Sequence, residues 1–298
     1  MKLTIAVPGD FSFWPTVFSH GWCALPPFKV LKEDRCFRGS FSIPGGPVVL
    51  ADISNGKPGQ LSVNSFRTLP QDQRRQLTAL VRTCFRLDEG MDEFHARARK
   101  HPGFRWVTKR RAGRMLRSQT VFEDVVKMMC TTNCSWALTT VMITNACRKL
   151  GSPAAEGEYG FPAPEALAGS SEKFIRKEIR AGYRAPYLLE FSRRVASGAL
   201  HPELWRDSAL PTPELFEEVR SVKGIGPYAA GNILKLLGRY DYLGIDSWCR
   251  KRFSELHGNG RRHSDRRIEK FYADFGKWRG LFFWMDMTKD WYIRDFPF

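Results

Sequence analysis

The sequence predicts an α+β protein in which an N-terminal antiparallel β-sheet packs on an all-α core. Residues 1 to about 65 contain short β-type runs, separated by the turn-forming stretches PGGP and SNGKPG. From about residue 71 the apolar residues recur every three or four positions, as in helices. We therefore expect a sheet-containing domain over residues 1–85 and a helical core over residues 86–298, either undivided or split into two helical subdomains.

Three β-type runs predict strands at residues 35–43, 47–53 and 60–65. Residues 71–85 predict the first helix, because Leu77, Leu80, Val81 and Phe85 share one face. A broad apolar face over residues 120–132 predicts a core helix. Further helices are expected at about 135–150, 171–181, 184–197, 213–221, 227–237, 247–257, 265–275 and 278–288.

The composition favours a polyanionic partner. Lys and Arg total 47 against 31 Asp and Glu, which gives a net charge of +16. Basic clusters at 109–114, 250–253 and 261–267 lie near aromatic residues, as in nucleic-acid-binding surfaces. No apolar run reaches the roughly 20 residues of a membrane-spanning helix, and the first residues lack a signal peptide. We expect a soluble intracellular protein, in the cytoplasm and nucleoid or in a eukaryotic nucleus.

Seven cysteines are scattered along the chain without CxxC spacing. This distribution argues against both a disulfide framework and a zinc site. We expect most of these cysteines to be buried, reduced thiols.

A glycine-marked turn between two helices is the most informative local feature. Gly224 and Gly226 allow a sharp turn and a close approach of the backbone to another molecule, and Pro227 suits the first position of the next helix. Such a turn is more often a packing device, but amides at a helix N-terminus also suit a phosphate oxygen. After Gly238, a further helix begins with Asp246 at or near its N-cap, where a carboxylate tends to stay ionised.

GIGPYAAGNIL followed by GIDSWCRK resembles the helix-hairpin-helix (HhH-GPD) family of DNA glycosylases, whose hairpin precedes a catalytic aspartate. GFPAPEALAG, IRAGYRAPYLLEFSRRV, VFEDVVKMMCTTNCSW and FRLDEGMDEFHARARKHPGF resemble segments of the 8-oxoguanine DNA glycosylases. This resemblance spans about residues 80–290. The sheet-rich start is similar in kind to the N-terminal domain that those enzymes share with bacterial 3-methyladenine DNA glycosylase II. The resemblance implies a helix-hairpin-helix core that repairs DNA by base excision.

The resemblance makes Asp246 the catalytic residue, whose negative charge opposes the oxocarbenium-like sugar that forms as the N-glycosidic bond breaks. The alternative role of Asp246 is a helix N-cap alone. Bifunctional members carry a Schiff-base lysine at the position of Tyr228, and a phenol cannot form an imine. The resemblance therefore implies a monofunctional enzyme that uses water. Lys223, the nearest lysine, precedes the hairpin and is read as solvated or phosphate-facing.

A base inside a duplex is out of reach, so the enzyme must turn the damaged nucleotide out of the stack. By resemblance, Asn133 is the candidate that fills the vacated space; a capping or core role is the equal alternative. Cys134 replaces a second asparagine of the family segment. The expected DNA-binding residues are Lys223, Gly224, Ile225, Gly226, Tyr228, Asn133, Ser247 and Arg250.

The base pocket departs from the 8-oxoguanine pattern. By resemblance, Asn232 replaces a cysteine, Phe283 a glutamine that reads the base edge, and Met287 a stacking phenylalanine. Trp248 stands where the family has a phosphate-contacting histidine. A pocket that reads a base by stacking and shape suits a cationic ring. Alkylated purine is therefore the first expected substrate and 8-oxoguanine the second. The expected pocket walls are Trp14, Trp22, Phe283, Trp284 and Trp248.

The resemblance implies no required cofactor. The resemblance also implies a monovalent or divalent cation at the hairpin, held by the backbone carbonyls of Arg220, Val222 and Ile225. No iron-sulfur cluster is expected, because only Cys249 follows the hairpin. The expected partner is double-stranded DNA with a damaged base, bound by a monomer. The alternatives are a mismatch thymine or uracil glycosylase and a noncatalytic lesion-binding protein of the same fold, and Asp246 argues against the latter.

Overall fold

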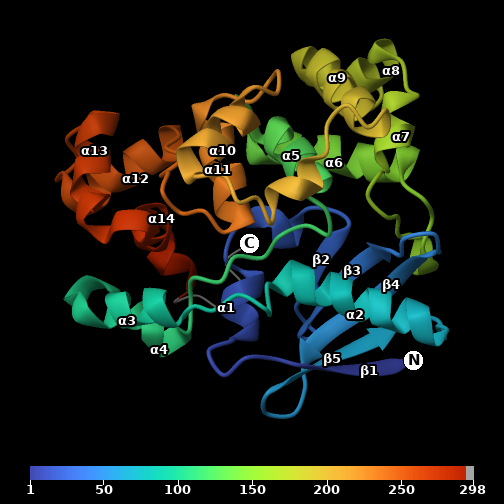
Figure 1. Ribbon diagram of the computed structural model, residues 1–298, viewed down its shortest axis with the longest axis horizontal. Coiled ribbons are helices and arrows are strands. Elements are labelled where there is room, and N and C mark those ends of the chain that lie inside the picture. Colours follow the sequence, from blue (N-terminus) through green and yellow to red (C-terminus); the bar gives the residue numbers. More distant parts are fainter. Residues whose placement is uncertain (293–298) are drawn as a thin grey trace.

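The structure is a computed structural model that describes residues 1–292. It has an α+β fold in which a five-stranded antiparallel sheet adjoins a larger helical part (Figure 1). The strands are β1 (Lys2–Ala6), β2 (Phe28–Leu31), β3 (Cys36–Ser42), β4 (Val48–Asn55) and β5 (Gln60–Ser65). Their order in the sheet is β1-β5-β4-β3-β2. The three strands expected from the sequence are β3, β4 and β5, and the structure adds the two edge strands.

Ten helices of the described residues match expected segments, and Pro, Gly and capping residues define many of their ends. The helices at residues 13–17, 92–100, 105–110 and 164–168 were not expected. In chain order, the helices are α1 (Phe13–Val17), α2 (Gln71–Phe85), α3 (Asp92–Lys100), α4 (Arg105–Arg110), α5 (Val121–Thr131), α6 (Trp136–Leu150), α7 (Pro164–Ala168), α8 (Glu172–Lys177), α9 (Ala185–Ala196), α10 (Thr212–Arg220), α11 (Pro227–Leu237), α12 (Ser247–His257), α13 (Asp265–Tyr272) and α14 (Arg279–Thr288). Short 3-10 turns lie at Gly21–Ala24, Pro102–Phe104, Ala155–Gly157, Gly182–Arg184, Pro202–Trp205, Ala273–Trp278 and Lys289–Tyr292. No helix within residues 1–292 is long and apolar enough to cross a membrane.

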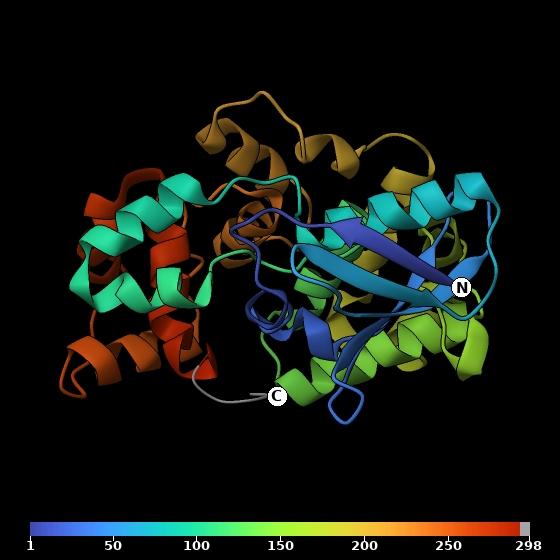
Figure 2. The same cartoon turned by 90° about the horizontal axis from the view of Figure 1, so that it is seen from below.

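Two clusters of buried side chains hold the chain together. The first joins the sheet to α2 and to α5–α11, and the ring of Phe85 lies 5.5 Å from that of Phe37 on β3. The second joins α3 and α4 to α12–α14, which gather on the left in Figure 1. In Figure 2 the strands lie between α2 and α6. The expected boundary at residue 85 stays a prediction, since the two clusters interleave along the sequence.

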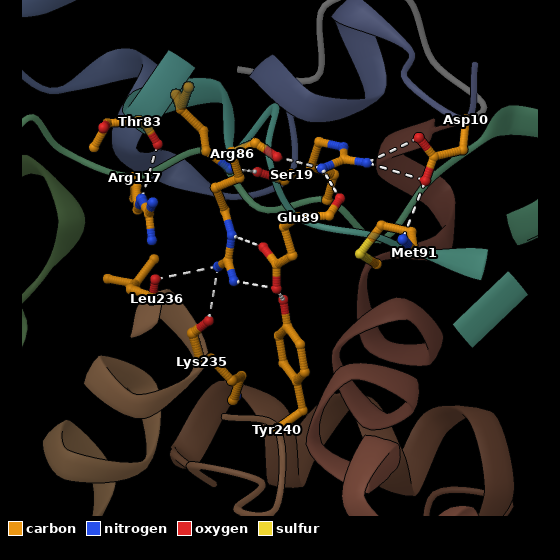
Figure 3. Close-up of polar contacts among 12 residues, drawn as sticks. Asp10, Ser19, Thr83, Arg86, Glu89, Met91, Arg117, Lys235, Leu236 and Tyr240 are labelled. Carbon is orange, nitrogen blue, oxygen red and sulfur yellow. Dashed lines mark hydrogen bonds and ion pairs between the residues drawn. The ribbon is translucent and has the colours of Figure 1, made fainter. Parts of the chain in front are cut away.

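A polar network connects the end of α2 to the end of α11 (Figure 3). Arg86 is fully buried and donates from Nη1 to the carbonyls of Lys235 (3.0 Å) and Leu236 (3.1 Å). These carbonyls belong to the last turn of α11, where amide donors of the helix run out, and that of Lys235 also accepts from the Gly238 amide at 3.1 Å. The Arg86 side chain also pairs with Glu89, which accepts from Tyr240 Oη at 3.2 Å. Burial opposes ionisation of Glu89, but the Arg86 guanidinium still lowers its pKa.

A second buried arginine extends this network to the N-terminal segment. Arg114 donates to both oxygens of Asp10 at 3.0 Å and to the carbonyls of Arg86 and Glu89. Asp10 also accepts from the amide of Met91. The end of α11 is therefore fixed by charged side chains from several distant segments.

All seven cysteines are free, as expected. Six are buried, and Cys134 is partly exposed.

Candidate active site

The glycine turn lies between α10 and α11 and is compact. The amide of Ile225 donates to the carbonyl of Val222 at 3.0 Å, and Gly224 has a φ of 89°. A Cβ atom at Gly224 would stand 2.8 Å from Cβ of Tyr187, so both the backbone and the contact require glycine. Gly226 is the N-cap of α11, with open space where a Cβ would point. The N-terminus of α11, whose first N–H after Pro227 is that of Tyr228, therefore borders a region that another molecule can approach.

Asp246 is the N-cap of α12. Its Oδ1 accepts from the amide of Cys249 at 2.7 Å, which holds the carboxylate at the positive end of the helix. The residue is only partly buried, and no arginine, lysine or histidine among residues 1–292 forms an ion pair with it. The carboxylate is thus fixed by local backbone geometry and still open to a ligand.

Two cavities meet at this carboxylate. The first, which we call the hairpin groove, has a volume of about 600 Å³ and runs along the glycine turn, the end of α5 and the start of α9. The second, which we call the aromatic cavity, has a volume of about 500 Å³ and lies among α5, α6, α11, α12, α14 and the N-terminal segment. Both volumes are typical of ligand-binding sites. The residues that line both cavities are Thr131, Cys134, Tyr228, Asp246 and Ser247.

Five tryptophans line the aromatic cavity: Trp22, Trp136, Trp248, Trp284 and Trp291. The last three contact one another, with ring centroids 5.6–6.2 Å apart. Hydrogen bonds orient two of the rings, because Trp22 Nε1 donates to Asp124 and Trp284 Nε1 donates to the carbonyl of Ser19. These rings give the cavity several fixed aromatic faces.

The position of the Trp136 ring depends on Gly21, which faces it. A Cβ atom at Gly21 would lie 2.3 Å from the Trp136 ring, so only glycine allows this contact. The Trp136 side chain is 43% exposed and therefore stands at the edge of the aromatic cavity.

Tyr228 lies in the first turn of α11, at the junction of the two cavities. Burial raises the pKa of its phenol, and the nearby Asp246 carboxylate raises it further. The phenol is therefore neutral near pH 7 and can donate a hydrogen bond. It cannot serve as an amine nucleophile.

The Asn232 side chain lines the aromatic cavity, but protein groups already occupy its amide. Nδ2 donates to the carbonyls of Tyr228 (2.9 Å) and Gly244 (3.3 Å), and Oδ1 accepts from Lys235 Nζ at 3.0 Å. Lys235 is 1% exposed and also donates to the carbonyl of Leu243. Burial lowers the pKa of Lys235 to about 8. This network holds the chain that leads from α11 to Asp246.

Three aromatic or apolar residues that we expected in the base pocket lie elsewhere. Phe283 is fully buried against Tyr272, with ring centroids 5.3 Å apart, because this face of α14 packs into the second core. Met287 is 1% exposed and lines a smaller pocket, which shares Trp248 and Trp291 with the aromatic cavity. Trp14 packs on Phe18 and lines a separate pocket near the β4–β5 turn. Trp22, Trp248 and Trp284 do line the aromatic cavity, as does Asn232.

The expected DNA-contacting residues form two groups. Gly224, Gly226, Tyr228, Asn133 and Ser247 all line the hairpin groove. Three others do not line it. Lys223 is exposed and pairs with Glu190 at 3.1 Å, Arg250 pairs with Asp265 at 2.7 Å, and the Ile225 side chain is buried. Ile225 can therefore contact a ligand only through its backbone.

The cation expected at the hairpin stays a prediction. The Val222 carbonyl already accepts the Ile225 amide, but a carbonyl oxygen has a second lone pair for a metal ion. Residues 1–292 contain no group of three or more His, Cys, Asp or Glu side chains that could hold a metal.

Asn133 has a φ of 47° and is exposed in the hairpin groove, next to two residues that we did not single out. Its Nδ2 lies 3.4 Å from Oη of Tyr183, and the Arg184 guanidinium stacks on the Tyr183 ring at 4.5 Å. Arg184 is 4% exposed and donates to the carbonyl of Thr132, while its Nε has no partner in residues 1–292. The motif GYRAP contains this pair, but the sequence does not show that it faces Asn133.

His20 and Trp136 are among the residues of the aromatic cavity that we did not single out. The signal for Trp136 was its place next to the expected asparagine segment. His20 carries no comparable sequence signal, because it reaches the cavity from a loop more than 200 residues before Asp246.

Comparison with known proteins shows a shared fold. No family model and no curated protein matches the sequence. Among solved structures, an 8-oxoguanine glycosylase/lyase from Clostridium acetobutylicum is 20% identical, with a TM-score of 0.74 over 96% of this chain and 95% of that one. A 3-methyladenine DNA glycosylase from Archaeoglobus fulgidus is 18% identical, with a TM-score of 0.76 over 97% and 99% of the two chains. MBOgg1, solved with a low-affinity DNA ligand, is 21% identical, with a TM-score of 0.76 over 97% and 96%. Residues 1–292 therefore adopt the fold of the 8-oxoguanine and 3-methyladenine DNA glycosylases.

Proposed function

We propose that the protein is a DNA glycosylase of base excision repair that hydrolyses the N-glycosidic bond of a damaged nucleotide. The observation that carries this proposal is the position of Asp246, which is open to the hairpin groove and to the aromatic cavity at once. A nucleotide with its backbone in the groove and its base in the cavity would have its sugar at the carboxylate. The negative charge there stabilises the oxocarbenium-like transition state, and it can orient the attacking water.

The hairpin groove suits the DNA backbone. Backbone amides at the start of α11 and the absence of side chains at Gly224 and Gly226 favour a close phosphate contact. Asn133, Tyr183 and Arg184 project into the same groove and are placed to contact the duplex where the nucleotide has left the stack. The proposed partner is therefore double-stranded DNA that contains a damaged base, bound by one copy of the chain.

The aromatic cavity favours an alkylated purine as the substrate. Its tryptophan faces attract a cationic ring, and alkylation of a purine ring nitrogen creates such a cation. The Asn232 amide is occupied by protein groups, which leaves stacking as the main source of base affinity. 8-Oxoguanine is the second candidate, since it is neutral and gains less from these faces.

Tyr228 makes the proposed reaction monofunctional. The position that would carry an amine nucleophile holds a neutral phenol, so no Schiff base can form there. Water then attacks the sugar, and the product is an abasic site in an intact strand.

The test compares the parent protein with Asp246→Asn on duplexes that each carry one lesion. Asparagine caps helices as well as aspartate, so the variant should keep the fold while losing the charge. We expect base release from an alkylated purine, with strand breaks only after hot alkali, and a loss of at least about 100-fold in the variant with DNA binding retained.

Other outcomes separate the alternatives. DNA binding without base release from any lesion identifies a noncatalytic lesion binder. Release of mismatched thymine or uracil alone identifies a mismatch enzyme. Strand cleavage before alkali, with a borohydride-trapped complex, contradicts the monofunctional reaction and points to Lys223.

A further inference from the structure

His20 lies in the wall of the aromatic cavity, directly before the 3-10 turn Gly21–Ala24. The side chain is 6% exposed, and its ring lies 4.9 Å from that of Trp22. None of the chemistry assigned to Asp246 or Tyr228 uses this histidine. It is nevertheless a nearly buried polar group in the wall of a largely aromatic site.

One hydrogen bond defines the tautomer of the ring. His20 Nε2 lies 2.6 Å from the carbonyl oxygen of Leu116. A carbonyl oxygen can only accept, so Nε2 carries the hydrogen. Within residues 1–292, Nδ1 has no hydrogen-bond partner. The protein does not fully enclose this atom, so a ligand can reach it.

The environment keeps this imidazole neutral. Burial, together with the cations of Lys127, Arg86 and Lys235, lowers the pKa of His20 to about 4, against the opposite effect of the Leu116 carbonyl. A neutral ring with hydrogen on Nε2 has a lone pair on Nδ1. Nδ1 is therefore a permanent hydrogen-bond acceptor near pH 7.

Several other polar groups that line the cavity are already engaged by protein atoms. The Asn232 amide is bonded at both ends, and Thr139 Oγ1 donates to the carbonyl of Cys130. The indole nitrogens of Trp22 and Trp284 donate to Asp124 and Ser19. Apart from the Asp246 carboxylate, His20 Nδ1 is therefore an acceptor of the cavity that remains available to a ligand.

We infer that His20 is a specificity-determining residue, whose Nδ1 accepts an N–H from the edge of the base in the aromatic cavity. This inference rests on the proposed function and extends it to the class of base. Stacking on the tryptophans holds the ring, and Nδ1 favours a purine that presents an amine, such as a methylated adenine. A base with no N–H on that edge leaves Nδ1 without a partner, which weakens its binding.

Two isosteric substitutions separate the two nitrogens. In His20→Gln, the amide nitrogen can take the place of Nε2 and keep the bond to Leu116, but the acceptor at Nδ1 is lost. In His20→Asn, the amide oxygen takes the place of Nδ1, and the bond to Leu116 is lost. The probes are two free bases, 3-methyladenine and 3-methylpurine, which differ only in the exocyclic amine. Their binding is measured by quenching of the cavity tryptophans.

We expect the parent to bind 3-methyladenine about tenfold more tightly than 3-methylpurine. His20→Gln should abolish this preference, and His20→Asn should retain it. In the parent, the ¹⁵N resonance of Nδ1 should shift with 3-methyladenine and not with 3-methylpurine. This signature decides the question even if a variant fails to fold.

An unchanged preference in His20→Gln, or an Nδ1 resonance that ignores the amine, overturns the inference. So does a parent that shows no preference between the two bases. If the parent releases bases from lesion duplexes in these cases, the proposed function stands and the inference alone fails. If the parent releases no base from any lesion duplex, the proposed function fails. The preference for 3-methyladenine over 3-methylpurine then still decides whether Nδ1 accepts an N–H in the cavity.

Discussion

Replacement of Lys235 by methionine tests the cation buried beneath the aromatic cavity. The side chain is 1% exposed, and burial lowers its pKa from 10.5 to about 8, against the nearby Asp246 and Cys249. The unfolded chain therefore holds this proton more tightly than the folded protein. The free energy of unfolding is therefore highest above the unfolded pKa of 10.5 and decreases as the pH falls through the folded pKa of about 8. The full shift in pKa corresponds to about 3 kcal/mol of unfolding free energy, and about 1 kcal/mol of this is lost between about pH 9 and pH 7.

Urea unfolding at these two pH values measures the effect. The free energy of unfolding of the parent should rise by about 1 kcal/mol more than that of Lys235→Met between about pH 7 and pH 9. Lys223→Met is the matched control, because the Lys223 side chain is 69% exposed and should lose no such dependence. Equal pH dependence in the parent and in Lys235→Met would refute the reasoning, since Lys235 would then titrate as an ordinary solvated lysine.

Gly224→Ala should lower the free energy of unfolding by about 2 kcal/mol, because φ is 89° and the new Cβ has no room, whereas Gly226→Ala should be tolerated; urea unfolding compares them. Arg86→Met should cost about 3–5 kcal/mol by leaving buried partners unpaired, and Arg82→Met, which breaks an exposed ion pair, less than about 1 kcal/mol. Similar losses in the two arginine variants would contradict this reading of the network. Tyr228→Phe should keep base release within about threefold of the parent, since the phenol is not the nucleophile; a loss as large as that of the aspartate variant would give the hydroxyl a chemical role.

Local sequence signals predicted much of the fold and the position of Asp246 at the start of a helix. Pro227 and Gly238 mark the two ends of α11, and Asp246 marks the start of α12, as the structure shows. Each signal depends on residues within one or two helical turns, where capping and backbone geometry act. The edge strands β1 and β2 were not singled out, because short strands acquire their identity from the partners with which they pair.

The walls of the aromatic cavity were predicted less well. Phe283 and Trp284 are neighbours on α14, but one turns into the core and the other lines the cavity. Which of them faces the cavity depends on how α14 is rotated against its neighbours, and successive side chains on a helix point in very different directions. Trp22 was expected in the pocket, but its neighbour His20, which reaches the cavity from the same N-terminal segment, has no local pattern that places it there.

The position of Asp246 was predicted better than the walls of the aromatic cavity because the proposed catalytic group and the proposed base pocket are held in place in different ways. The Asp246 carboxylate is held by the amide of Cys249, three residues away, so its position depends little on distant side chains. The aromatic cavity, where we propose that the base is recognised, is lined by side chains from α6, α11, α12, α14 and the N-terminal loop, which only tertiary packing brings together. Substitutions among these walls can therefore change the preferred base while the capped carboxylate stays in place. The His20→Gln variant is a direct case, because it changes an acceptor in the cavity wall and leaves the N-cap of α12 untouched.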